Sequence, residues 1–338
     1  MKINKNLLRV INSGRRRLNR PYEMLTTHRT RKLLDSVVAE VSSSTRPVFI
    51  IGPPRCGSTL LYQAMTHYFN FCYFSNEMMR EPRQIPALML SRHCSVDYFS
   101  DFENRYGITS QANGPHESYP FWRRFYPKGI NDYVQGQPVN EQSAREIRKT
   151  IQFLVEHYNR PFICKNIETC LRLQSLREII PNAFFIVLKR NPIFTAASIL
   201  KGRSEHMGGR DVWMGMKPET YLTVKEEAVF VQVSQQILEA YRCFYKDVDQ
   251  MNYTEVYYED FCEQPQHVLD GLKETLSGAG IELEHSGRTL PSLFQQKQTT
   301  NLSSKDIKEL HNVFAESDVF QKYLCRYSIE NSSFRGSI

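Results

Sequence analysis

The stretch PVFIIGPPRCGSTLL, residues 47–61, decides the fold of this 338-residue chain. Its first part is a short apolar run, typical of a strand that is buried on both faces. A tight turn with two glycines follows, and apolar residues then recur at helical spacing as far as residue 69. A buried strand that leads through a small-residue turn into a helix is typical of a parallel α/β sheet.

Further apolar runs repeat this alternation along the chain. We expect strands at 71–74, 161–165, 184–189 and 254–258, and helices at 58–69, 141–158, 170–180, from 192 onward, 220–247 and 265–276. This order predicts an α/β fold, a parallel β-sheet flanked by helices on both faces, with its ligand site at the carboxyl ends of the strands. We expect residues 46–338 to form a single domain, in which the irregular stretches 79–137 and 202–218 are substrate-covering inserts.

The net charge of +7 comes from the start of the chain. Residues 1–32 hold ten Lys or Arg and one acid, a net charge of +9, so the rest of the chain carries −2. We expect residues 1–45 to form a basic N-terminal arm and helix, which is either solvated or attracted to an anionic membrane surface. Nucleic acid is not an expected partner, because no aromatic residue interleaves with these cations before Tyr22.

The eight cysteines include no CxxC spacing and no zinc-like pairing with histidine, so we expect buried, reduced thiols and no metal site. No apolar run approaches the ~20 residues that span a bilayer, and the first residues lack the apolar segment of a secretory signal. These features predict a cytoplasmic protein, with peripheral membrane contact through the basic arm as an open alternative.

The turn after the first strand has the spacing of a phosphate-binding loop. Gly52 and Gly57 are separated by four residues, and Ser58 and Thr59 open the following helix. Backbone N–H groups in such a loop converge on an anion, and the helix N-terminus adds a favourable potential. Ser58 stands where a triphosphatase needs lysine, and the cation of this loop is Arg55. The sequence therefore predicts a phosphate site without the usual triphosphate-binding lysine.

The apolar run at 184–189 leads to a second cationic segment. Arg190 follows the predicted strand directly, Ser198 lies eight residues later in the next helix, and Arg203 follows near the end of that helix. In a triphosphatase, one such strand ends in an acid that supports Mg²⁺. Here the planar fork of arginine suits a second phosphate without a metal ion.

Together these motifs resemble the sulfotransferase family that uses 3′-phosphoadenosine-5′-phosphosulfate (PAPS). PPRCGSTLL is similar to that family's 5′-phosphosulfate loop, and LKRNPIFTAASILKGR is similar to its 3′-phosphate segment. ICKNIETCLRLQSLREIIPNAFFIVLKR and YYEDFCEQP continue the likeness, which extends over about residues 47–276. The resemblance is nearest to the bacterial and protein-tyrosine branches. It implies the P-loop-like sulfotransferase fold, with PAPS as the co-substrate.

The resemblance also implies roles for matching positions. The implied nucleotide-binding residues are Arg55, Cys56, Gly57, Ser58, Thr59, Arg190, Ser198, Arg203 and Tyr258. Of the first five, all but Cys56 would hold the 5′-phosphosulfate. Arg190 and Ser198 would hold the 3′-phosphate, with Arg203 as an extra contact, and the tyrosine would contact the nucleotide. Lys165, together with Arg55, would stabilise charge on the transferring group.

In-line sulfuryl transfer needs a base for the acceptor hydroxyl, and the sequence offers three. Glu77 lies where the protein-tyrosine branch carries its catalytic glutamate, whereas His116 and Glu117 lie in the insert expected to wall the acceptor pocket. The acceptor hydroxyl could belong to a small molecule, a glycan, a lipid or a peptide. Two alternative functions stay open: a P-loop nucleotide kinase or hydrolase, and a non-catalytic adaptor that keeps the fold.

Overall fold

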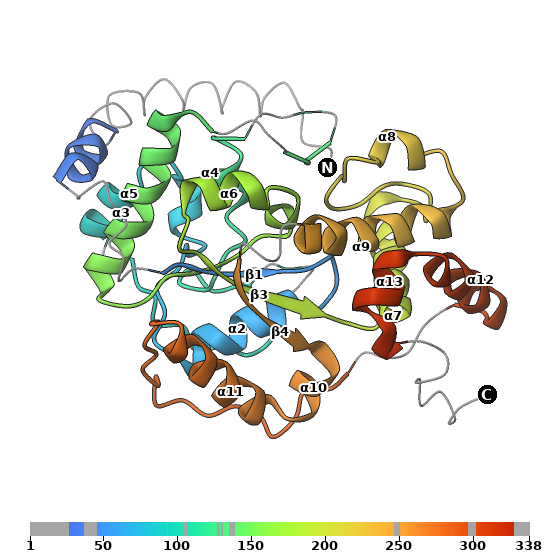
Figure 1. Ribbon diagram of the computed structural model, residues 1–338. Coiled ribbons are helices and arrows are strands. Elements are labelled where there is room, and N and C mark those ends of the chain that lie inside the picture. The colour runs from blue at the N-terminus through green and yellow to red at the C-terminus, as the bar shows by residue number, and fades with distance from the viewer. Residues whose placement is uncertain are drawn as a thin grey trace, which may run out of the picture.

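The computed structural model describes residues 27–36, 46–92, 94–103, 107, 109–126, 129, 131–134, 139–246, 251–296 and 302–327. Within these residues, a four-stranded sheet lies at the centre of the molecule (Figure 1). Its strands are β1 (Val48–Ile51), β2 (Ile163–Lys165), β3 (Phe184–Lys189) and β4 (Asn252–Tyr257). They pair in the order β2-β1-β3-β4, and every pair is parallel. The predicted parallel sheet is confirmed.

The position of β1 in this order determines where a ligand can bind. The chain passes from β1 to β2 on one side and then crosses to β3 on the other side of β1. The carboxyl end of β1 is therefore the topological switch point, where open α/β sheets form their ligand crevice. Every residue of β1, β2 and β3 is buried, which explains why these strands are uniformly apolar up to their last residues.

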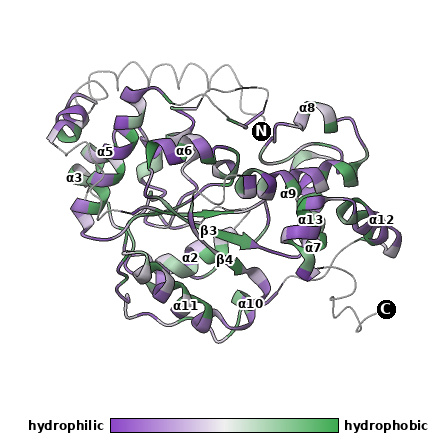
Figure 2. Cartoon of the chain, in the orientation of Figure 1, coloured by the Kyte–Doolittle hydropathy of each residue, from purple (hydrophilic) through white to green (hydrophobic). Residues whose placement is uncertain are grey.

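Helices cover both faces of the sheet, as the alternation of strands and helices predicts (Figure 1). On one face lie α2 (Ser58–Tyr68) and α11 (Pro265–Gly278), and on the other lie α5 (Glu141–Tyr158) and α6 (Leu173–Ile179). In Figure 2 the central strands are mainly green, the colour of hydrophobic residues, whereas the outer helix α5 carries much purple. Beyond the sheet, α7 (Pro192–Gly202) packs on α9 (Val229–Lys246).

The remaining elements are shorter or lie outside these layers. They are η1 (Met78–Arg80), α3 (Ile85–Arg92), α4 (Tyr119–Trp122), η2 (Ile167–Leu171), η3 (Arg203–Met207), α8 (Tyr221–Val224), α10 (Tyr258–Glu263), α12 (Ser304–Ala315), α13 (Asp318–Tyr323) and η5 (Cys325–Tyr327). The predicted insert at 79–137 thus contains α3 and α4 in its described part.

The predicted strand at 71–74 is wrong. Its residues are fully buried, but Cys72 makes only one isolated bridge, to Phe162, so burial and not sheet pairing accounts for their apolar character. The predicted helix at 170–180 begins earlier, as the 3₁₀ turn η2, because the side chain of Asn166 accepts a hydrogen bond from the N–H of Glu168 at 2.9 Å. That cap starts a tight turn before α6 begins.

The long helix predicted at 220–247 is interrupted. It divides into α8 and α9, and residues 225–228 form a turn between them. The side-chain amide of Gln232 donates to the carbonyl oxygens of Lys225 and Glu227, at 3.0 and 2.9 Å. Because Gln232 satisfies these carbonyls, the turn does not need helical hydrogen bonds at these positions.

The predicted basic arm lies outside the described residues except for 27–36, which are helical. All eight cysteines are free thiols, and six of them are buried. In the described part of the chain, no helix is both long and apolar enough to cross a membrane.

Candidate active site

The phosphate loop, residues 52–57, connects β1 to α2 at the switch point of the sheet. Gly57, its last residue, has a φ of 96°, and a Cβ atom there would lie only 2.2 Å from the ring of Tyr258. Arg55 has a φ of 66°, in the left-handed region that non-glycine residues rarely adopt. A loop with such a backbone, packed directly against an aromatic ring, is typical of a functional turn.

The two phosphate motifs meet beside this loop. Nη1 of Arg190 donates a hydrogen bond to the carbonyl oxygen of Arg55 at 2.8 Å, and its guanidinium lies 4.5 Å from the ring centroid of Tyr258. Nε of Arg55 donates to Oγ of Ser198 at 3.1 Å. Residues from the ends of β1, β3 and β4 and from α7 therefore form one cationic cluster.

Lys165 adds a third cation on the opposite side of β1. It is the last residue of β2, in register with Ile50 of β1, and only 4% of its side chain is exposed. Its Nζ donates to Oγ1 of Thr59 at 3.2 Å and forms an ion pair with the carboxylate of Glu117, which is 12% exposed. An ion pair with so little exposure leaves an uncompensated charge when either partner is removed. The structure thus places a carboxylate and an ammonium group at the first turn of α2.

The three candidate bases have different surroundings. Glu117 contacts Lys165, whereas the Nδ1 atom of His116 accepts the backbone N–H of Ser118 at 2.7 Å. Burial lowers the pKa of His116, so the ring is neutral with its proton on Nε2, and neither ring nitrogen offers a lone pair to a substrate. Glu77 begins the η1 turn, and within the described residues its carboxylate makes no hydrogen bond or ion pair with the cationic cluster.

Two other predicted loop residues are packed into the protein. Cys56 is fully buried, which raises the pKa of its thiol, and its backbone N–H closes the turn by donating to the carbonyl oxygen of Pro53 at 3.3 Å. Ser58 is 4% exposed and is the first residue of α2. Both residues shape the loop, and their contacts with a nucleotide stay predictions.

Arg203 lies apart from this cluster. Its side chain is fully buried, its Nη1 donates to Oε1 of Gln232 at 2.8 Å, and its guanidinium lies over the ring of Trp213 at 5.0 Å. Burial lowers its pKa to about 10. Trp213 belongs to the insert at 202–218, in which a Cβ atom on Gly215 would lie 3.4 Å from Pro54 of the phosphate loop. Arg203 therefore anchors a segment that covers the loop, and its predicted contact with a phosphate stays a prediction.

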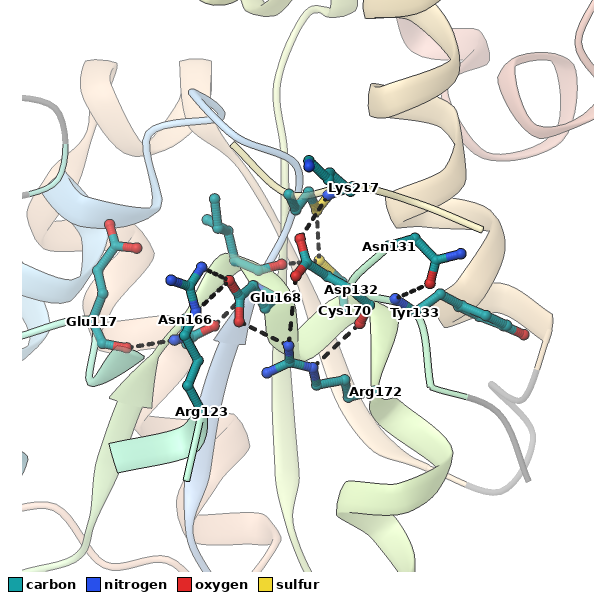
Figure 3. A network of polar contacts seen from close by, with 12 residues as sticks. Glu117, Arg123, Asn131, Asp132, Tyr133, Asn166, Glu168, Cys170, Arg172 and Lys217 are labelled. Carbon is teal, nitrogen blue, oxygen red and sulfur yellow. Dashed lines mark hydrogen bonds and ion pairs between the residues drawn. The ribbon is translucent and has the colours of Figure 1, made fainter. Parts of the chain in front are cut away.

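Figure 3 shows a polar network that the sequence analysis did not identify. The side chain of Asn166 donates to the carbonyl oxygen of Glu117 at 2.6 Å, and so fixes the backbone that carries this carboxylate. Glu168, whose side chain is 2% exposed, forms ion pairs with Arg123 and Arg172. A polar run directly after the strand that ends in Lys165 is the sequence signal for these residues.

The charge of this crevice comes from side-chain cations and a helix N-terminus. Among the residues that the structure describes, no three His, Cys, Asp or Glu side chains are grouped as metal ligands would be. Arginines on one side of β1 can bind phosphate groups, and the Lys165–Glu117 pair lies on the other side. The arrangement can hold a ligand with two anionic groups next to a carboxylate that accepts protons.

The chain is similar to several solved structures. No curated protein matches the chain. Among solved structures, it is similar to the sulfotransferase STF9 from Mycobacterium avium, at 13% identity and a TM-score of 0.47, over 88% of this chain and 73% of that one. It is also similar to the sulfotransferase STF1 from Mycobacterium tuberculosis H37Rv, at 12% identity and a TM-score of 0.47, over 87% of this chain and 81% of that one. A sulfotransferase from Alicyclobacillus acidocaldarius matches at 14% identity and a TM-score of 0.42, over 80% of this chain and 92% of that one.

The family assignment rests on a match between this chain and the model of a whole protein family. The model of the sulfotransferase family matches residues 47–282, which is more than half of the chain and includes the phosphate loop, Lys165, Arg190 and Tyr258. The chain belongs to the sulfotransferase family.

Proposed function

We propose that this protein transfers the sulfuryl group of PAPS to the hydroxyl group of an acceptor. The observation that carries the proposal is the contact of Arg55 with both Arg190 and Ser198, which joins two sequence motifs 143 residues apart into one cationic cluster. A single nucleotide with phosphates at both its 3′ and 5′ positions suits such a cluster. Membership in the sulfotransferase family supports this choice of ligand.

Each half of the cluster suits one end of the donor. The phosphate loop and the first turn of α2 suit the 5′-phosphosulfate, because the helix N-terminus offers N–H groups and a positive potential. Arg190 and Ser198 suit the 3′-phosphate, since guanidinium forks and hydroxyl groups are good phosphate partners. The Tyr258 ring, packed on Gly57 and Arg190, sets the spacing between the two halves.

We assign the proton-accepting role to Glu117. In the proposed step, the acceptor oxygen forms a bond to sulfur while the bond from sulfur to the 5′-phosphate oxygen breaks, and the hydroxyl proton passes to the Glu117 carboxylate. Lys165 stabilises the charge that develops on the leaving oxygen, because its ammonium reaches Thr59 at the start of α2. Asn166 keeps Glu117 in position by donating a hydrogen bond to the backbone carbonyl oxygen of Glu117.

Calorimetry with the desulfated product, adenosine 3′,5′-bisphosphate, tests the proposal without knowledge of the acceptor. We expect the bisphosphate to bind at least tenfold more tightly than adenosine 5′-monophosphate, because only the former engages Arg190 and Ser198. Incubation with radiolabelled PAPS and a panel of phenols, alcohols and glycans would then identify acceptors. Absence of bisphosphate binding would reject the proposal.

The alternative of a P-loop kinase or hydrolase is less favoured, because Ser58 occupies the position of the triphosphate lysine. Tight binding of magnesium ATP in the same calorimetric series, without binding of the bisphosphate, would favour that alternative. The buried free thiols and the basic arm support our further proposal of a cytoplasmic protein that contacts a membrane only peripherally.

A further inference from the structure

One cation near the Lys165–Glu117 pair is exposed to solvent. Half of the Arg123 side chain, 49%, is accessible, although its Nε donates to Oε1 of Glu168 at 3.2 Å and its Nη2 also contacts that oxygen. Because Glu168 is only 2% exposed, its carboxylate contacts Arg123 from the protein interior. These two described hydrogen bonds use Nε and Nη2 of the guanidinium.

Glu168 does not pair with Arg123 alone. Its second oxygen, Oε2, lies 2.9 Å from Nη2 of Arg172, so one buried carboxylate is shared between two arginines (Figure 3). Arg172 is 6% exposed and also approaches Asp132, at 3.9 Å. Arg172 is therefore enclosed by acids, whereas half of the Arg123 side chain is accessible.

Tyr119 links this accessible cation to the proposed base. The guanidinium carbon of Arg123 lies 5.0 Å from the centroid of the Tyr119 ring. Burial and the nearby charge of Glu117 raise the pKa of the hydroxyl on this ring. Asn166, whose Oδ1 accepts the N–H of Glu168, also donates to the carbonyl oxygen of Glu117. Arg123 and Glu117 thus both lie close to the Tyr119 ring.

We propose that Arg123 is a specificity residue that binds an anionic group of the acceptor. This inference rests on the proposed function, with Glu117 as the base, and it narrows the acceptor class to hydroxyl compounds that carry a carboxylate, sulfate or phosphate. The planar fork of arginine, fixed by Glu168, is well suited to such a group.

A pair of probes that differ only in charge tests the inference. We would measure calorimetrically the binding of para-hydroxyphenylpropionate and of its neutral amide to the full chain saturated with adenosine 3′,5′-bisphosphate. The wild-type complex should bind the carboxylate on the order of tenfold more tightly than the amide. In Arg123→Gln this preference should fall to less than about twofold, and in Arg123→Lys part of it should return.

Arg124→Gln is the matched control, because Arg124 is the next residue but pairs with Glu146 and with the carbonyl oxygen of Pro82. This variant should keep the wild-type preference. Equal binding of the carboxylate and the amide, or binding of neither, would overturn the inference. The proposed function would still stand if the protein binds the bisphosphate in the same experiment. Loss of the preference in both variants would also overturn the inference, and failure to bind the bisphosphate would reject both proposals.

Discussion

The substitution Glu117→Gln tests whether the Glu117 carboxylate accepts a proton in catalysis or only forms an ion pair with Lys165. If Glu117 accepts the acceptor proton, the amide should lower kcat by about 10²- to 10⁴-fold, the usual contribution of a general base. Binding of adenosine 3′,5′-bisphosphate should change by less than about threefold, because the arginine cluster lies on the other side of β1.

The structure also sets the cost in stability. The pair is 4% and 12% exposed, and breaking such a pair by removing one partner costs about 3–5 kcal/mol. The glutamine oxygen can still accept a hydrogen bond from Lys165, so we expect a smaller loss of about 1–3 kcal/mol in the free energy of unfolding.

Single-turnover transfer from radiolabelled PAPS, with an acceptor that the wild-type protein uses, measures the first effect. Urea unfolding measures the second. The control is Glu77→Gln, which removes the competing candidate and should leave transfer within about threefold of the wild type. The reasoning is refuted if Glu117→Gln keeps wild-type turnover, or if Glu77→Gln loses as much as Glu117→Gln does.

Three further predictions follow from contacts of the phosphate loop and of α2. Arg190→Ala should weaken binding of adenosine 3′,5′-bisphosphate about tenfold or more but that of adenosine 5′-monophosphate far less, and equal losses in calorimetry would contradict its assignment to the 3′-phosphate. Gly57→Ala should abolish bisphosphate binding and lower stability by about 1–3 kcal/mol, since its Cβ would collide with Tyr258; binding comparable to wild type would show that the loop can move away. His67 accepts the N–H of Ser100 and contacts the carbonyl oxygen of Thr289, and burial lowers its pKa from 6.5. As the pH drops below 6.5, the unfolded chain therefore binds a proton at this ring before the folded chain does, so the free energy of unfolding should fall. Urea unfolding across that range should show a smaller decline in His67→Gln, and an unchanged decline would exclude His67 as its source.

The loop after β1 and its neighbours could be placed from local sequence because their parts are consecutive. The apolar strand, the glycines and the hydroxyl residues of the loop lie within fifteen residues, and the order of the strands then brings Arg190 to the same edge of the sheet. Parallel strands must end at one edge, so a cation that follows each strand is placed without knowledge of side-chain packing.

The base could not be chosen in this way. Glu117 reaches Lys165 because an insert folds back over the sheet, and no periodicity in residues 79–137 describes that path. The apolar run at 71–74 was misleading for a related reason, since complete burial produces the same composition in a loop as in a strand. The contacts of Arg203 with the ring of Trp213 and the amide of Gln232 could not be predicted either, because these partners lie 10 and 29 residues away in the sequence.

In the proposed complex, Arg190 and the phosphate loop hold opposite ends of one nucleotide. A crystal structure with adenosine 3′,5′-bisphosphate tests it most directly. We expect the 5′-phosphate on the N–H groups at residues 55–59 and the 3′-phosphate within hydrogen-bonding distance of Arg190 and Ser198. A nucleotide bound with its 3′-phosphate away from both side chains would contradict it.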